Sequence, residues 1–312
     1  MKYKYKNLFE PVESLKPLAP KSPRRKPDQL VTFLRRPILF ALFLSFSSLI
    51  LVLPALASGQ EAQSRKQSTT TPPNSPQNSI SKKTAFARRV NPHPPAIDGR
   101  LNDPAWQDGE WFSDFIQFDP EEGQPPSEPT AFKVVYDDSH LYLAIRCYDS
   151  QPGSIEQRLS RRDSLSGDYL LVFIDSLYDQ RTSYCFAVNA AGVKADQLLF
   201  NDGFDENTVD ISWDPIWEIK TAIDDDGWTA EMKIPFSQLR FGRRQEQIWG
   251  FQVMRQLFRK NEVSLWQRIL KNAPGWTSQF GELRGVTAIK PPRQVEMLPY
   301  AVGSLRNYPR QE

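Results

Sequence analysis

The chain has 312 residues, with 39 Lys and Arg against 37 Asp and Glu, and its charge is unevenly distributed. Residues 1–36 carry ten basic and three acidic side chains and residues 58–90 carry six and one, so residues 91–312 hold a net charge of −10 within the total of +2. Phosphate binding needs clustered positive charge, which excludes nucleic acid as an expected partner of this acidic part.

Residues 1–57 are typical of a basic leader followed by a secretory signal. Arg35 and Arg36 precede "PILFALFLSFSSLILVLPALAS", in which an apolar run of about 16 residues is followed by small residues at Ala55 and Ala57. This pattern predicts cleavage after Ala57 and export to the periplasm or outer membrane. An uncleaved anchor is the alternative, although a spanning helix needs about 20 apolar residues.

Residues 58–89 are rich in Ser, Thr, Pro, Gln and Lys and contain almost no large apolar side chains. Such a segment cannot bury enough apolar surface to offset the loss of chain entropy on folding. We therefore expect a disordered tether between the signal and a folded domain over residues 90–290.

The folded part begins with "AIDGRLNDPAW", residues 96–106. Asp98-Gly99 between apolar residues predicts a tight type I′ hairpin joining two short strands. Asp103-Pro104 predicts the start of a helical turn, with the Asp carboxylate as the N-cap. A large aromatic on such a turn is more often a core residue than a ligand platform, so Trp106 is expected to be buried.

The remainder reads as short strands separated by turns. The segments are rich in β-branched and aromatic residues, and no long amphipathic helix separates them, which predicts an all-β, antiparallel β-sandwich with a jelly-roll-like arrangement. Residues 235–241, "PFSQLRF", are the expected extra helical turn, and Trp213, Trp217, Trp228, Trp249 and Trp266 are expected to be buried. The predicted strands cover residues 131–137, 141–149, 168–175, 181–189, 193–200, 217–223, 227–235, 248–256 and 262–268.

Motifs for cofactors and metals are sparse. The two histidines give neither a histidine metal site nor a Ser-His-Asp arrangement, and Gly-rich phosphate loops are absent. No cofactor is required by this reading. A structural calcium held by residues such as Asp149 or Asp175 is an open alternative. Cys147 and Cys185 lie in apolar runs and are expected to be buried thiols, with a disulfide as the alternative.

Several phrases, taken in order, resemble the family 9 carbohydrate-binding module. They are "AIDGRLNDPAW", "VVYDDSHLYLAIRCYDS", "DYLLVFID", "GWTAEMKIPFSQLRF", "WGFQV" and "FGELRGV". The phrases "DQRTSYCFAVNAAGVKAD", "SWDPIWE" and "LWQR" look like a subgroup in which this module precedes an outer-membrane β-barrel of unassigned function. In that subgroup, residues 291–312 would be a linker and the first strand of a barrel that this sequence does not reach.

The resemblance implies a site in which two tryptophans clamp a terminal sugar ring. Trp276 in "APGWTSQFGEL" stands at the second clamp position, whereas the first position reads "SRRDSLSGDYLLVFID" and lacks a tryptophan. Arg161, Arg162 and Asp163 stand there instead. We therefore expect substrate binding by stacking on Trp276 with polar support from these three residues. The alternative is a solvated basic turn that pairs with the nearby acidic loop.

Three functions follow as expectations. The first is an exported carbohydrate-binding module that recognises an oligo- or polysaccharide in carbohydrate catabolism and has no catalytic residue of its own. The second is a plug or docking domain on an outer-membrane barrel or envelope protein, with a relic sugar site. The third is part of a glycoside hydrolase acting on O-glycosyl bonds, which would need two carboxyl groups about 5 to 10 Å apart across an open cleft.

Overall fold

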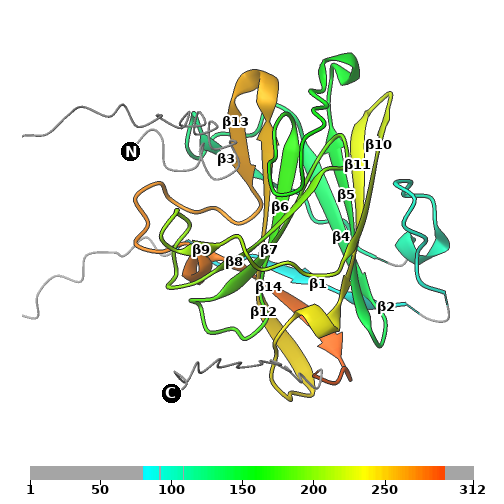
Figure 1. Ribbon diagram of the computed structural model, residues 1–312, viewed down its shortest axis with the longest axis vertical. Coiled ribbons are helices and arrows are strands. Elements are labelled where there is room, and N and C mark those ends of the chain that lie inside the picture. Colours follow the sequence, from blue (N-terminus) through cyan, green and yellow to red (C-terminus); the bar gives the residue numbers. More distant parts are fainter. Residues whose placement is uncertain (1–79, 91–92, 108, 292–312) are drawn as a thin grey trace, which may run out of the picture. The chain divides into compact units, whose positions relative to one another are not determined.

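The computed structural model describes residues 80–90, 93–107 and 109–291, which form two β-sheets packed face to face (Figure 1). The larger sheet comprises β1 (Thr84–Phe86), β3 (Ile116–Asp119), β6 (Tyr169–Asp175), β7 (Ser183–Asn189), β8 (Lys194–Leu199), β9 (Val209–Asp210), β12 (Glu246–Leu257), β13 (Glu262–Leu265) and β14 (Gly281–Thr287). The smaller sheet comprises β2 (Arg88–Arg89), β4 (Thr130–Tyr136), β5 (His140–Tyr148), β10 (Glu218–Asp224) and β11 (Gly227–Pro235). The predicted β-sandwich is confirmed.

Strand order shows which predicted segments become neighbours. The smaller sheet runs β10-β11-β5-β4-β2, and the larger sheet runs β1-β14-β12-β6-β7-β8-β9, with β13 and β3 attached beside β12. Each of the nine predicted segments contains a strand, because alternating apolar residues and short turns specify strands locally. Within the described residues, the helical content consists of short 3-10 turns: η1 (Pro104–Trp106), η2 (Pro152–Ser154), η3 (Phe236–Gln238), η4 (Phe258–Lys260) and η5 (Thr277–Gln279).

The start of the domain and the direction of its first strands both differ from the prediction. Residues 84–89 were expected to belong to the tether, but they form β1 and β2, which pair in parallel with β14 and β4. Ala85 and Ala87, although small, are buried against the core. The polar composition of the whole segment gave no sign of these two buried positions. The sheets are therefore mixed, and the antiparallel expectation holds only for the other pairings.

The main core lies between the two sheets. Trp217, Trp228, Trp249 and Trp266 are buried in it as predicted, and Trp213 is partly buried against it. A second apolar cluster covers the outer face of the larger sheet, and a third covers part of the outer face of the smaller sheet.

Both cysteines are buried thiols, as predicted. Cys147 lies in the main core, whereas Cys185 belongs to the cluster on the outer face of the larger sheet. Burial raises the pKa of Cys147 to about 11 and also raises that of Cys185. The two thiols therefore stay protonated and unreactive at neutral pH.

Trp106 is a core residue, with 1% of its surface exposed against the outer face of the smaller sheet. Its indole N–H donates to Glu231 on β11 at 2.8 Å, and the same carboxylate accepts the backbone N–H groups of Gly99 (2.7 Å) and Asp98 (3.0 Å). Pro104 begins the expected helical turn, but the Asp103 side chain makes no capping hydrogen bond.

The hairpin expected at Asp98-Gly99 is wrong. No strand flanks this turn, because its backbone N–H groups bond to the Glu231 carboxylate instead of to a second strand. Gly99 has a φ of +91°, and a Cβ there would lie 3.0 Å from the Thr221 backbone, so the position needs glycine for a close approach to β10.

Some expectations lie outside the described residues. They are the signal at residues 1–57, the tether up to residue 79 and the linker at residues 292–312. Within the described ranges, the structure contains no helix that is both long and apolar enough to cross a membrane.

Candidate functional site

Trp276, the expected stacking residue, is enclosed by other aromatic rings. Only 4% of its surface is exposed. Phe204 stacks on it with a centroid distance of 4.9 Å and an interplanar angle of 20°, which places a phenyl ring where a sugar ring would stack. Phe118, Phe173 and Phe280 meet it edge to face. In this arrangement Trp276 offers no open face to a ligand.

A hydrogen-bonded latch holds Phe204 in place. The Asp202 carboxylate accepts the backbone N–H groups of Trp276 at 3.0 Å and Ser278 at 2.8 Å, and it also accepts the Ser278 hydroxyl at 2.7 Å. A Cβ at Gly275 would lie 1.8 Å from this carboxylate, so glycine is needed for the close approach. The loop that carries Phe204 is therefore fixed to the segment that carries Trp276.

A variant tests whether Trp276 is a structural residue. We expect Trp276→Ala to lower the free energy of unfolding by about 3 to 5 kcal/mol, because it removes a buried ring and leaves a cavity. Trp111→Ala is the matched control, since Trp111 is 42% exposed and its truncation should cost far less. Chemical denaturation of both variants measures the difference. Equal, small losses would show that Trp276 is dispensable for the fold.

Arg162 and Asp163, two of the expected polar residues, join a charged cluster at β8. Arg162 pairs with Asp196 at 2.7 Å and with Asp214 of the acidic loop, as the basic-turn alternative expects. The Asp163 carboxylate lies 3.8 Å from the Arg162 guanidinium, and burial raises its pKa. Arg161 is exposed. The ion pairs and hydrogen bonds of Arg162 and Asp163 join this turn to β8 and to the acidic loop.

The sequence did not predict that Lys194, Asp196 and Trp217 belong to this cluster. The Trp217 indole N–H donates to Asp196 at 2.7 Å, and the Lys194 ammonium lies 5.3 Å from the Trp217 ring centroid. Burial lowers the pKa of Lys194. The available signal was the i, i+2 spacing of Lys194 and Asp196, which places both on the same face of a strand. Asp196 is 1% exposed, and its carboxylate is hydrogen-bonded to Arg162 and Trp217. The cluster therefore stabilises the fold.

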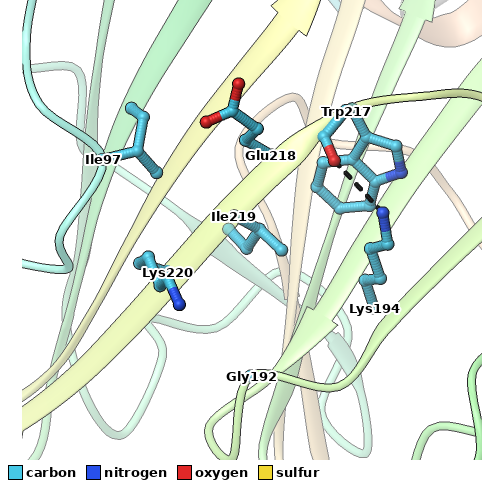
Figure 2. A pocket seen from close by; sticks show the side chains of 7 residues that line it. All are labelled: Ile97, Gly192, Lys194, Trp217, Glu218, Ile219 and Lys220. Carbon is cyan, nitrogen blue, oxygen red and sulfur yellow. Dashed lines mark hydrogen bonds between the residues drawn. The ribbon is translucent and has the colours of Figure 1, made fainter.

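A hollow of about 340 Å³, here called the edge notch, lies beside β10 (Figure 2). Lys220 stands opposite Glu231 and so lies on the outer face of the smaller sheet, whereas Lys194 stands opposite the core residue Val188. The two lysines therefore flank β10 instead of converging on one ligand. The notch is lined by Ile97, Gly192, Lys194, Trp217, Glu218, Ile219 and Lys220.

A second hollow of about 540 Å³, here called the outer hollow, lies on the outer face of the smaller sheet. Arg146 of β5 donates two parallel hydrogen bonds to Asp224 of β10, at 2.6 and 2.7 Å. Segment 99–102 forms one wall. The hollow is lined by Gly99, Arg100, Leu101, Asn102, Arg146, Ala222, Ile223, Asp224 and Thr229.

These hollows bear on the hydrolase alternative. Paired-carboxylate hydrolysis needs two carboxyl groups facing one cleft. Glu218 is the single carboxylate lining the edge notch and bonds to Lys233 at 2.9 Å, and Asp224 is the single carboxylate lining the outer hollow and is held by Arg146. Neither of the two hollows presents such a pair.

The residues considered for calcium have other partners. Asp149 is buried beside two guanidinium groups: it pairs with Arg259, and Arg255 lies 3.9 Å away. Asp175 accepts backbone N–H groups of Gln180 at 2.8 Å and Asp179 at 3.2 Å. In the described part of the chain, no group of three or more His, Cys, Asp or Glu side chains could hold a metal ion. Calcium binding stays a prediction.

Asp175 gives a pH-dependent prediction. Burial raises its pKa to about 6. The folded protein therefore binds the Asp175 proton more tightly than the unfolded chain does. The resulting stabilisation is fully present below about pH 4 and is lost as the pH rises through about 6. We therefore expect the free energy of unfolding of Asp175→Asn, relative to the unsubstituted protein, to increase by about 3 kcal/mol between about pH 3.5 and 7.5. Denaturation at both pH values measures it, and a constant or decreasing difference would contradict it.

The described part of the chain is a two-sheet β-sandwich with polar hollows on and beside its smaller sheet. Residues 97–283 match the carbohydrate family 9 binding domain-like family, and this chain belongs to that family. The family resemblance noted in the sequence is thereby confirmed. No curated protein matches the chain.

Two solved structures are similar to this chain. A protein of Bacteroides uniformis proposed to bind carbohydrate is similar with a TM-score of 0.51 and 15% identity, covering 65% of this chain and 99% of its own. A family 9 carbohydrate-binding module of Caldicellulosiruptor kristjanssonii in complex with cellotriose has a TM-score of 0.48 and 20% identity, covering 70% of this chain and 100% of its own.

Proposed function

We propose that this protein is a carbohydrate-binding module that recognises an oligo- or polysaccharide and performs no catalysis by itself. The observation that carries the proposal is the family match over residues 97–283, which spans almost all of the described sandwich. Hollows lined by a few polar groups on a rigid sheet are consistent with a binding module.

The mode of recognition is a separate part of the proposal. Aromatic stacking on Trp276 would require Phe204 to leave its ring face and the Asp202 latch to open. Arg162 and Asp163 would also have to give up partners within the charged cluster. We therefore propose that the folded protein binds its glycan with groups other than Trp276.

Calorimetric titration tests the proposal. The full chain is titrated with cellotriose, xylotriose, mannotriose and trigalacturonate, and we expect saturable binding of at least one. Heat-unfolded protein is the control for non-specific heats. A folded sample that binds none of a broad panel of neutral and acidic glycans would contradict the proposal.

A second candidate is a docking domain on an envelope protein or an outer-membrane barrel. The specific observation in its favour is the Phe204 ring stacked on Trp276, since a filled stacking face is expected of a relic sugar site. Affinity capture from envelope extracts in the presence of excess glycan tests it. Capture of a defined partner that glycan does not compete away would support docking, and a loss of capture with glycan would support sugar recognition.

We further propose that the protein is exported to the periplasm or outer membrane, in a carbohydrate catabolic context. The basic leader, the apolar run and the small residues before Ala57 support this. N-terminal sequencing of the protein recovered from cell envelopes should begin at Ser58. A mature chain that retains the apolar run would instead support the anchor alternative.

A further inference from the structure

We infer that the outer hollow is a glycan subsite for a neutral sugar that presents two adjacent hydroxyl groups. This inference rests on the proposed function and assigns it a place on the outer face of the smaller sheet. The hollow, of about 540 Å³, lies within the usual range for small-molecule sites, about 300 to 1,000 Å³.

The Arg146–Asp224 pair supplies the polar groups of this subsite. Its two parallel hydrogen bonds hold a planar donor group beside a planar acceptor group. The guanidinium has five N–H donors. Two of them bond to Asp224 and one nitrogen also lies 3.4 Å from Asp226, which leaves donors for a ligand oxygen. The Asp224 carboxylate has about four acceptor positions and is half exposed. Adjacent hydroxyls, each both donor and acceptor, match this arrangement.

An exposed aromatic side chain lies next to this pair. Tyr148 is 42% exposed, and the Arg146 guanidinium lies 5.5 Å from its ring centroid. Both residues belong to β5 and are two positions apart, so they share the outer face of the sheet. An exposed ring beside fixed polar groups lets a sugar place its C–H face on the ring while its hydroxyls meet the pair.

The wall of the hollow is anchored at Gly99 without a ligand. The Thr229 hydroxyl donates to the Gly99 carbonyl at 2.6 Å, and the Gly99 N–H donates to the buried Glu231 carboxylate at 2.7 Å. Segment 99–102 is thus anchored at its first residue, through both backbone polar groups of Gly99. A wall that needs no ordering on binding lowers the entropic cost of association.

The charge of the site selects a neutral ligand over an acidic one. Asp224 neutralises Arg146, and Asp226 lies a further 3.4 Å from the same guanidinium. The hydrogen bond from Arg146 lowers the pKa of Asp224, so both partners stay ionised at neutral pH. Arg100 at the rim donates its backbone N–H to the Asp98 carboxylate at 2.8 Å, which places a further carboxylate beside the hollow. A sugar carboxylate would therefore meet Asp224 and the more exposed Asp226 beside the guanidinium.

The test uses the full chain titrated by calorimetry with neutral trisaccharides, namely cellotriose, xylotriose and mannotriose, and with trigalacturonate. For the neutral ligand that binds, we expect Asp224→Asn and Tyr148→Ala each to weaken affinity at least tenfold. Asp138→Asn is the matched control, because it breaks another exposed ion pair, the one with Arg89, outside both hollows, and it should change affinity less than twofold. Thermal unfolding verifies that each variant is folded.

The outcomes separate this inference from the proposed function. Binding of a neutral glycan that both variants retain, or binding of trigalacturonate alone, would overturn the outer-hollow assignment and leave a carbohydrate-binding module with another site. Folded protein that binds no glycan would overturn both. If either variant loses its fold, Arg146→Lys replaces it, since Lys keeps the charge but not the planar donor pair, and the same tenfold loss is expected.

Discussion

Glu231→Ala is expected to lower the free energy of unfolding by about 3 kcal/mol or more. The substitution removes the acceptor of the Trp106 indole N–H and of the Gly99 and Asp98 backbone N–H groups. A buried donor left without an acceptor costs about 1 to 3 kcal/mol. Burial raises the pKa of Glu231, which means that the fold destabilises its charged form. Removing the carboxylate relieves this destabilisation and offsets part of the loss. Urea denaturation with tryptophan fluorescence measures the change.

Glu218→Gln is the control for Glu231→Ala. Glu218 lies on the neighbouring strand β10 and its side chain is 62% exposed, so its loss should leave the midpoint of unfolding almost unchanged. If Glu231→Ala were as stable as this control, the carboxylate would not be the anchor of segment 96–106. Trp106 would then owe its position to apolar packing alone.

Asp149→Ala is expected to cost about 3 to 5 kcal/mol. Asp149 pairs with Arg259 and lies 3.9 Å from Arg255, which is 1% exposed. Removing one partner of a buried ion pair leaves an uncompensated buried charge, which is strongly destabilising. Arg255 retains hydrogen bonds to the Pro129 and Tyr148 carbonyls at 2.9 and 2.8 Å, but the Gln151 backbone N–H loses its acceptor, which adds to the loss of the charge interaction. Thermal unfolding at neutral pH checks it.

Asp138→Ala is the comparison for Asp149→Ala. Asp138 also pairs with an arginine, Arg89, but its side chain is 88% exposed. Exposed ion pairs contribute little because water and salt screen them. We therefore expect Asp138→Ala to change the free energy of unfolding only slightly, with or without added salt. Asp149→Ala should lower it at any salt concentration. Similar losses for the two variants would mean that burial does not set the strength of the Asp149 network.

The fold was largely predictable because its signals are local. Alternating apolar residues between turn residues identified nine strands, and the position of Trp106 on a short turn identified it as buried. The missed strands depend on partners distant in sequence. β1 is held by its parallel pairing to β14, and the predicted turn at Asp98-Gly99 bonds to Glu231 on β11 and not to a second strand. No local pattern indicates either partner.

The candidate site was less predictable for the same reason. The resemblance places Trp276 at a clamp position, but the packing of Phe204 on its ring depends on how two distant loops meet. The outer hollow combines segment 99–102 with Arg146 of β5 and Asp224 of β10, which become neighbours only through the order of strands in the sheet. Arg161, Arg162 and Asp163 were found together because they are adjacent in sequence.

The most direct test of a carbohydrate-binding module with its site on the smaller sheet is a titration of the full chain by ¹H–¹⁵N NMR. Amide and indole signals are followed as neutral trisaccharides are added. We predict saturable shifts confined to segment 99–102, Arg146 to Tyr148 and Asp224 to Gly227, with the Trp276 indole signal unchanged. Shifts centred on Trp276, or a folded spectrum that no glycan perturbs, would contradict this account.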